Sequence, residues 1–357
     1  MRNPFFLTLG SAVILLMLNV GCSKNNGYNN NPPPPASNNY SQVNLVTDVG
    51  GGPYSSTLVD ASLINPWGIA VNPAGVIWIA ANHTGLSTVY DKNGNTVLSP
   101  VTIASPGHAT GGAPTGIVYN GTNDFQVAGT PAKFIFDTED GTITAWTSGA
   151  VAPIVADRSA QEAVYKGLAL AKDGAENFLY AANFHAGTID VFDKDFHMVT
   201  TKPFVDPNMP AGFAPFNIRS IGDNLYVTYA KQDADKEDDV EGDGNGYVDI
   251  FKPDGSLVKR FASQGALNSP WGIVAAAPGF WEVDNTILIG NFGDGKISVY
   301  DQDGKFLGQL KKGDNPIVIG GLWALENNIP STGNQLYFTA GPSDETHGVF
   351  GYVMKAN

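Results

Sequence analysis

The sequence Asn65-Pro66-Trp67-Gly68-Ile69-Ala70 returns later in the chain as Ser269-Pro270-Trp271-Gly272-Ile273-Val274. Around these two stretches, a short apolar run repeatedly follows a Gly or Asn at a nearly constant interval. The six anchors, separated by 48, 51, 50, 55 and 49 positions, are Gly68-Ile69, Gly116-Ile117, Gly167-Leu168, Asn217-Ile218, Gly272-Ile273 and Gly321-Leu322. A period of about 50 residues with four short strands per unit is typical of a β-propeller. The sequence therefore predicts an all-β, six-bladed β-propeller.

Each repeat contains four apolar or alternating stretches rich in β-branched and aromatic residues, as expected of strands packed face to face. In the first repeat these stretches are 68–71, 76–81, 87–90 and 97–103. The last repeat ends after its third stretch, 349–353, so its fourth strand must come from elsewhere. Residues 43–46 precede the first anchor as 257–261 precede the fifth, and we expect them to close the ring as an outer strand. The predicted propeller spans 43–357.

The repeated unit Pro-Trp-Gly-Ile, with a later Gly-x-Ile-x-Val-Phe/Tyr-Asp, resembles the NHL-type six-bladed propellers. Asn65 to Ala70, together with Tyr229-Ala230-Lys231-Gln232-Asp233 in the fourth repeat, is similar to a family of secreted bacterial propeller proteins that has no assigned activity. The resemblance covers nearly the whole predicted propeller and implies the same fold. Gluconolactonase and strictosidine-synthase-like propellers are more distant relatives in fold, and no catalytic residue is carried over from them.

Residues 1–21 are typical of a secretory signal: Arg2 is followed by an apolar core, 5–18, that is too short to cross a bilayer comfortably. Gly21 then precedes Cys22, the only cysteine, which resembles a bacterial lipoprotein signal in which that cysteine is lipidated. Asn19 departs from this pattern, because Leu usually stands there. The alternative is an ordinary secretory signal in which Cys22 is incidental.

Residues 22–42 are rich in Asn and contain four consecutive prolines, 32–35, which favour an extended polyproline tether that cannot bury a core. We therefore expect a lipid-anchored protein of the cell envelope of a Gram-negative bacterium, held at its outer membrane. The net charge of −14 excludes nucleic acid as a partner. We expect a monomer whose loop face binds a partner protein, a glycan or a small ligand.

The predicted site lies where the second strands end, on the face that carries the second-to-third-strand loops. Amide and carboxylate oxygens arranged around the channel could hold Ca²⁺. Such an ion could activate water for lactone or ester hydrolysis with Asn183, Asn291 and Asp137, which makes a metal-dependent hydrolase the alternative to a binding protein. Otherwise these side chains cap turns. The polar residues at these strand ends are Asn82, His83, Asp137, Asn183, His185, Asn291 and Asp294.

Two of these residues, His83 and His185, occupy equivalent places in their repeats. They could therefore form a two-histidine metal site, although the simpler explanation is that they make structural polar contacts on loops. Trp67 and Trp271 also match each other, at the entry to an inner strand. These indoles could stack on a flat ligand in the channel mouth, or they could supply the bulk that packing between blades requires.

The fourth repeat departs from the others in an acidic segment, 231–246, between its second and third strands. Within it, Asp239, Glu241 and Asp243 precede Gly244 as in the opening of a calcium loop, but Ile250 stands where an EF-hand has its bidentate Glu. The segment is therefore not an EF-hand. We expect either a calcium-binding loop at the channel mouth or a solvated acidic flap kept mobile by repulsion between its charges.

Overall fold

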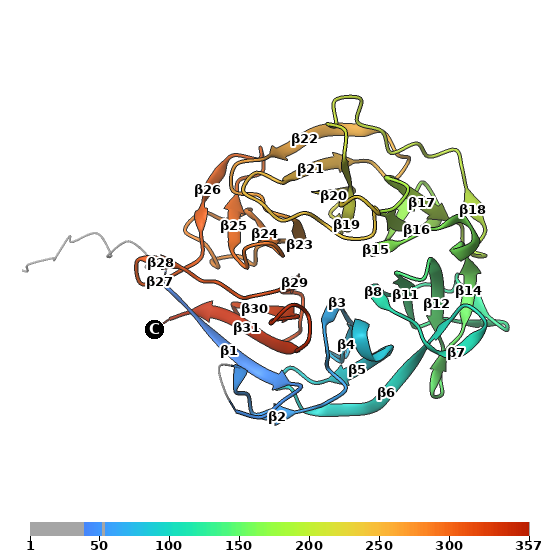
Figure 1. The fold of residues 1–357 in the computed structure, drawn as a ribbon, viewed down its shortest axis with the longest axis horizontal. Coiled ribbons are helices and arrows are strands. Elements are labelled where there is room, and N and C mark those ends of the chain that lie inside the picture. Colours follow the sequence, from blue (N-terminus) through green and yellow to red (C-terminus); the bar gives the residue numbers. More distant parts are fainter. Residues whose placement is uncertain (1–38, 52–53, 357) are drawn as a thin grey trace, which may run out of the picture. The chain divides into compact units, whose positions relative to one another are not determined.

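The computed structural model describes residues 39–51 and 54–356. The predicted signal, Cys22 and most of the predicted tether lie outside these residues. The propeller unit is a ring of six sheets, each built on four antiparallel strands (Figure 1). Within the described ranges the helical elements are two short 3₁₀ turns, η2 (Asn82–Thr84) and η3 (Ser159–Gln161). The predicted six-bladed β-propeller is confirmed.

Each blade is a meander of four strands that runs from the channel to the rim. Blade 1 consists of β3 (Pro66–Val71), β4 (Ile77–Ala81), β5 (Leu86–Tyr90) and β6 (Thr96–Ser105). Blade 2 consists of β8 (Pro114–Tyr119), β11 (Phe134–Thr138), β12 (Thr142–Trp146) and β14 (Ile154–Asp157). Blade 3 consists of β15 (Tyr165–Asp173), β16 (Glu176–Asn183), β17 (Thr188–Phe192) and β18 (Met198–Val199).

The second half of the ring repeats this arrangement. Blade 4 consists of β19 (Phe213–Ile221), β20 (Asn224–Lys231), β21 (Gly246–Phe251) and β22 (Leu257–Ser263). Blade 5 consists of β23 (Pro270–Ala275), β24 (Ile287–Asn291), β25 (Ile297–Tyr300) and β26 (Phe306–Gln309). Blade 6 consists of β29 (Leu322–Glu326), β30 (Gln335–Ala340), β31 (Val349–Lys355) and β1 (Tyr40–Thr47). Short accessory strands are β2 (Leu58–Val59), β7 (His108–Gly111), β9 (Gln126–Val127), β10 (Thr130–Pro131), β13 (Val151–Ala152), β27 (Lys311–Lys312) and β28 (Asn315–Pro316).

The ring closes as the sequence predicts, because β1 pairs antiparallel with β31 and becomes the outer strand of blade 6. The strand begins at Tyr40, so residues 40–42, which we assigned to the tether, belong to the sheet. Tyr40 is fully buried, and its hydroxyl donates to the carbonyl oxygen of Phe280 in blade 5 at 2.6 Å. Burial of this ring and its hydrogen bond explain why the strand starts earlier than the apolar pattern indicates.

Strand register identifies the equivalent inner-strand residues of the six blades, and it corrects one anchor. Ile69 pairs with Ile79 on the second strand of blade 1, and Leu325 pairs with Phe338 in the same way in blade 6. The sixth anchor is therefore Ala324-Leu325, whereas Gly321, which we predicted, lies in the preceding loop with a φ of 64°. The residues just before the six anchors are Trp67, Thr115, Lys166, Phe216, Trp271 and Trp323.

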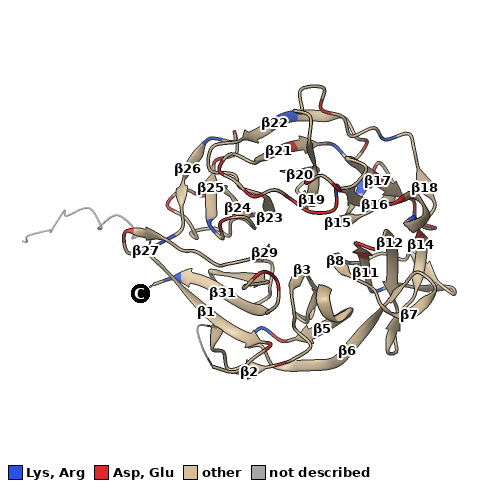
Figure 2. Ribbon diagram, viewed as in Figure 1, with Lys and Arg blue, Asp and Glu red and all other residues tan. Residues whose placement is uncertain are grey.

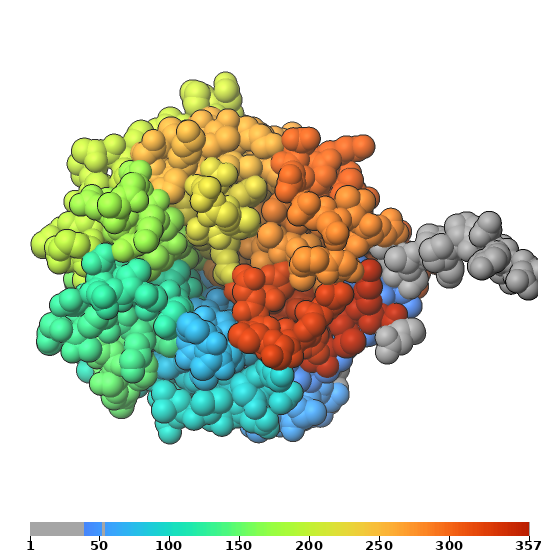
Figure 3. Space-filling model, turned by 180° about the vertical axis from the view of Figure 1, so that it is seen from behind, coloured from blue at the N-terminus to red at the C-terminus, as the bar shows by residue number. Residues whose placement is uncertain are grey.

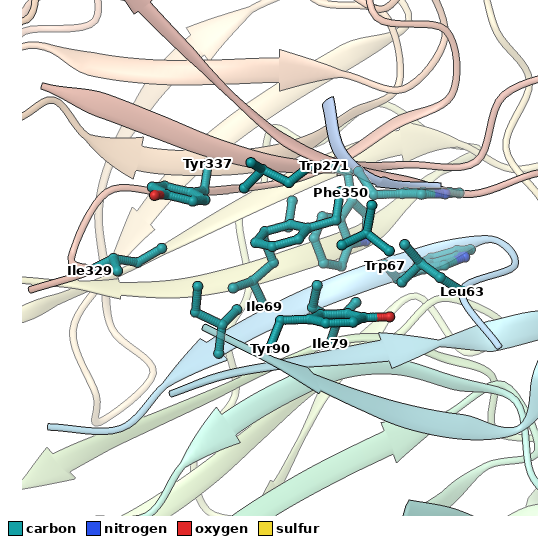
Figure 4. Close-up of a cluster of buried hydrophobic side chains, with 14 of the residues drawn as sticks. Leu63, Trp67, Ile69, Ile79, Tyr90, Trp271, Ile329, Tyr337 and Phe350 are labelled. Carbon is teal, nitrogen blue, oxygen red and sulfur yellow. The ribbon is translucent and has the colours of Figure 1, made fainter. Parts of the chain in front are cut away.

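Gly is needed at most anchors because neighbouring inner strands approach closely beside the channel. A Cβ atom on Gly68 would lie 2.6 Å from the carbonyl oxygen of Thr115, and one on Gly116 would lie 2.3 Å from the amide nitrogen of Leu168. Both neighbours are backbone atoms, so a larger residue would push the blades apart. Buried side chains fill the space between the blades and around the channel, and Figure 4 shows one such cluster, which includes Trp67 and Trp271.

Candidate functional site

The loop-face end of the channel is closed by aromatic residues from the positions just before the anchors. The rings of Trp67 and Trp323 stack with centroids 3.5 Å apart, and Trp271 meets both edge-on at 5.9 and 5.8 Å. Phe216 contacts Trp67 and Trp323 from the fourth blade. All three Trp side chains are buried. The indoles pack on one another, and we call this set of four rings the aromatic plug.

Lys166 is the charged member of the same ring of positions, and its side chain is only 2% exposed. Its Nζ lies 2.5 Å from Glu139 Oε1 and 3.1 Å from Asp238 Oδ1, and 5.3 Å from the centroid of Trp67. Burial acts to lower the pKa of Lys166, but the two carboxylates outweigh it and raise that pKa above its usual value. A buried ammonium needs such counter-ions, because desolvation of an unpaired charge is costly.

The carboxylates around Lys166 come from loops of different blades. Glu139 lies in the β11–β12 loop, and its Oε2 accepts a hydrogen bond from Asn82 Nδ2 at 2.7 Å. Glu345 lies in the β30–β31 loop, where it accepts a hydrogen bond from Asn65 Nδ2 and lies 3.9 Å from His83 Nε2. Burial raises the pKa of Glu345 to about 7, and the negative charge of Glu139 acts in the same direction.

The acidic segment is folded against the channel mouth. Asp233 N donates to the carbonyl oxygen of Asp238 at 2.8 Å, and Val240 N donates to that of Lys231 at 2.7 Å, which makes a tight hairpin. Gln232 Nε2 donates to the carbonyl oxygen of Phe184 in blade 3 at 2.6 Å. Figure 2 shows the red acidic segment crossing the inner part of the ring near β19 and β15. This hairpin brings Asp238 to Lys166.

Two adjoining cavities of about 450 and 410 Å³ open on this face and share Lys166, Asp238, Asp344 and Glu345. We call them together the acidic basin. One side is aromatic and includes Tyr54, Trp67, Phe292 and Trp323. Among the described residues, Lys166 is the only Lys or Arg that lines either cavity. The seven carboxyl groups that line the basin belong to Glu139, Glu237, Asp238, Asp239, Glu241, Asp344 and Glu345.

The structure brings some of the predicted site residues to the basin. His83, Asp239, Glu241 and Trp67 line it, and Asn82 contacts it through Glu139. Burial raises the pKa of Asp239 to about 6, although the Lys166 ammonium acts in the opposite direction. Burial also raises the pKa of Glu241, and the charges of Asp344 and Asp294 add to this effect.

Three other predicted residues are engaged in hydrogen bonds at strand ends. Asn183 donates to Asp190 Oδ2 at 3.1 Å and accepts from Ala186 N at 3.2 Å. Asn291 Nδ2 donates to Asp294 Oδ1 at 3.0 Å. These contacts are of the kind that cap turns.

The remaining predicted residues lie apart from the basin. Asp137 is fully buried, its Oδ1 accepts from Gly116 N at 2.6 Å, and burial raises its pKa to about 7. His185 Nε2 lies 3.9 Å from Glu162, Asp243 is exposed, and Trp271 belongs to the aromatic plug.

Within residues 39–51 and 54–356, no group of three or more His, Cys, Asp and Glu side chains is arranged to hold a metal ion. Asp239 and Glu241 line the same cavity, and the charge of Glu241 adds to the raised pKa of Asp239, whereas Asp243 is exposed and does not line the basin. Calcium binding by the acidic segment stays a prediction. In the same described ranges, no helix has the length and apolar character needed to span a bilayer.

Sequence reasoning missed Lys166, Glu139, Asp238 and Glu345 as site residues. A signal for Lys166 was present, because it occupies the place that Trp holds in three other repeats. The carboxylates lie in places that the sequence did mark, Asp238 in the acidic segment and Glu139 and Glu345 just after second strands, but nothing local distinguished them from other exposed Asp and Glu.

Comparison with known proteins identifies relatives that are themselves uncharacterised. No protein-family profile matches the chain. Over 312 residues it is 35% identical to the uncharacterized protein R648 of Acanthamoeba polyphaga mimivirus, covering 83% of this chain and 76% of the relative. It is 34% identical over the same length to L690 of the same virus, covering 83% and 81%. These relatives are viral and give no support to a bacterial lipoprotein origin.

Solved structures with a similar fold show much lower sequence identity. A streptogramin B lyase matches with a TM-score of 0.52 at 11% identity, covering 88% of this chain and 96% of the lyase. A Bacteroides thetaiotaomicron protein of unknown function matches with a TM-score of 0.55 at 14% identity, covering 88% and 76%. An α-L-arabinanase of Penicillium chrysogenum matches with 0.56 at 12% identity, covering 88% and 98%. At such identities the likeness establishes the propeller fold alone.

Proposed function

Since the chain belongs to the same family as the uncharacterised mimivirus proteins R648 and L690, we propose its function from the acidic basin: a binding propeller that captures a small organic cation on its loop face. The observation that carries the proposal is the charge balance. Seven carboxyl groups line the basin, and Lys166, the one Lys or Arg there among the described residues, forms ion pairs with only two of them, Glu139 and Asp238. A concave surface with one sign of charge concentrates ligands of the opposite sign.

The aromatic side of the basin favours an organic cation over a hydrated inorganic one. Phe292 stacks on Trp323 with centroids 4.0 Å apart, and Phe292 and Tyr54 remain half-buried. Aromatic faces attract ammonium groups by about 0.5–2 kcal/mol. Cavities of about 450 and 410 Å³ suit a small amine, and carboxylates such as Glu241 and Asp344 would accept its N–H donors.

The carboxyl groups give this binding a characteristic pH dependence. The pKa of Glu345 is raised to about 7 and that of Asp239 to about 6, so both are partly protonated near neutral pH. A bound cation favours the ionised forms and therefore displaces protons. We expect affinity to increase as the pH rises from 6 to 8, with net release of protons on binding.

Isothermal titration with spermidine, at low salt and in two buffers of different protonation enthalpy, tests the proposal. We expect saturable binding, proton release, and at least tenfold weaker binding in Glu345→Gln and Asp344→Asn. Asp235→Asn is the matched control, because Asp235 is an exposed acidic residue of the same segment that does not line the basin. Absence of saturation at millimolar spermidine, or an equal loss in Asp235→Asn, would refute the proposal. A parallel titration with Ca²⁺ tests the predicted calcium dependence.

We further propose that Cys22 carries a lipid that anchors the propeller in a Gram-negative cell envelope, at the outer membrane. The support is the sequence of residues 2–22, since these lie outside the described residues. Metabolic labelling with an alkyne-tagged fatty acid in a bacterial host should tag the full chain and should not tag Cys22→Ser. Labelling that persists in Cys22→Ser would contradict the anchor.

A further inference from the structure

A separate cavity, of about 260 Å³, lies at the end of the channel opposite the acidic basin, on the face shown in Figure 3. Its wall consists mainly of residues 69–71 at the end of β3, 117–119 at the end of β8 and 168–170 in the middle of β15. Among the described residues, the charged ones that line it are Arg219, near the end of β19, and Glu326, at the end of β29. We call this cavity the arginine cup.

The arginine cup is separated from the acidic basin. The aromatic plug closes the loop-face end of the channel, and the intervening stretch of channel contains a space of only about 20 Å³. Such a space holds about one water molecule. Any ligand of the cup must therefore enter from this face, and its binding does not depend on the function proposed for the basin.

Arg219 is held from one side by a buried carboxylate. Glu326, whose side chain is 5% exposed, accepts hydrogen bonds from Asn327 N at 3.0 Å and Asn328 N at 2.7 Å through Oε1. Its Oε2 accepts from Arg219 Nη2. This is the only hydrogen bond of the Arg219 guanidinium within the described residues, and the side chain is 28% exposed. Most of its five N–H donors therefore have no protein partner among the described residues, and the side chain lines the cup.

A fixed guanidinium with unused donors recognises planar oxyanions through paired N–H···O bonds. Most other residues of the cup are aliphatic, but the side chains of Ile69, Ile117 and Leu168 are buried between the blades, so polar backbone atoms form much of its wall. Because Glu326 already offsets the charge of Arg219, the cup suits a small, singly charged anion better than a doubly charged phosphate. We propose that the arginine cup binds a small monocarboxylate. Arg219 pairs with the ligand carboxylate, and Glu326 acts as a positioning residue that orients the guanidinium.

Benzoate is a suitable probe, and benzamide, which has the same ring without the charge, is its matched control. Saturation-transfer NMR on the full chain should detect benzoate binding at millimolar concentration, with benzamide at least tenfold weaker. Arg219→Gln should lower benzoate affinity at least tenfold. Lys172→Gln should leave it unchanged, because Lys172 is an exposed cation on β15 that does not line the cup.

Arg219→Gln leaves Glu326 buried and uncompensated, so it can destabilise the fold. The double variant R219Q/E326Q removes both charges and keeps amide groups in their place, and circular dichroism checks that it is folded. Loss of benzoate binding in a folded R219Q/E326Q supports the proposal. Equal binding of benzoate and benzamide, unchanged binding in the double variant, or no detectable benzoate binding to the parent chain would overturn it.

Discussion

Replacement of Lys166 by Met tests whether the ion pairs at the channel mouth stabilise the ring. Met keeps most of the buried stem and removes the ammonium that lies 2.5 Å from Glu139 and 3.1 Å from Asp238. Removal of one partner from a fully buried ion pair costs about 3–5 kcal/mol. Here the orphaned carboxylates regain some solvation, because Glu139 is 27% and Asp238 78% exposed. We therefore expect a loss of about 2–3 kcal/mol in the free energy of unfolding.

Urea denaturation monitored by tryptophan fluorescence measures this loss as a lower midpoint at an unchanged m-value. The double variant E139Q/K166M removes the carboxylate left uncompensated, so we expect it to recover about half of the loss. Coupling of this kind is the signature of direct interaction in a double-mutant cycle. A loss below about 1 kcal/mol, or strictly additive effects of the two substitutions, would contradict the assigned role of Lys166.

Three further predictions concern the scaffold. Burial raises the pKa of Asp137 from 3.8 to about 7, so the folded state holds the carboxyl proton more tightly than the unfolded state. The free energy of unfolding should therefore fall as the pH rises from 4 to 7. Asp137→Asn should remove this pH dependence and, above pH 7, should be more stable than the parent by up to about 4 kcal/mol in denaturant titrations. Gly116→Ala should lower the free energy of unfolding by more than about 1–3 kcal/mol in the same assay, because the added Cβ would lie 2.3 Å from the amide nitrogen of Leu168. Gly320→Ala should leave the stability nearly unchanged, because no atom lies within 4 Å of its added Cβ. Tyr40→Phe leaves the carbonyl oxygen of Phe280 unpaired and should cost about 1–2 kcal/mol; a Tyr40→Phe protein as stable as the parent would argue against closure through this contact.

The repeat pattern predicted most of the fold because a propeller blade is a local unit. Each strand is marked by its own apolar residues, and the unpaired last repeat indicated that the N-terminal strand closes the ring. The prediction failed where local pattern was ambiguous. Gly321 resembled an anchor, but strand pairing places Ala324-Leu325 there instead. The start of β1 was also placed too late, because the contact between Tyr40 and Phe280 joins residues far apart in the sequence.

The candidate site was predicted only in outline. The face was inferred from the loops that connect second and third strands, and His83, Asp239 and Glu241 do line the acidic basin. Asn183 and Asn291 were predicted as site residues because they occupy matching positions in their repeats, yet their side-chain amides form hydrogen bonds at strand ends. Equivalent positions in repeats show that residues share a local environment, and they do not show which side chains meet.

The sequence by itself determined the number of blades, their order and the strand that joins the two ends of the ring, because each of these follows from short-range periodicity. Only the tertiary structure decided that Lys166 lies against Trp67 and between Glu139 and Asp238, and that Arg219 is held by Glu326 at the other mouth. The physical reason is ring closure. Residues 27 to 107 positions apart in the sequence become neighbours around one axis. Their burial and charge pairing, which no local pattern records, determine the chemistry of both ends of the channel.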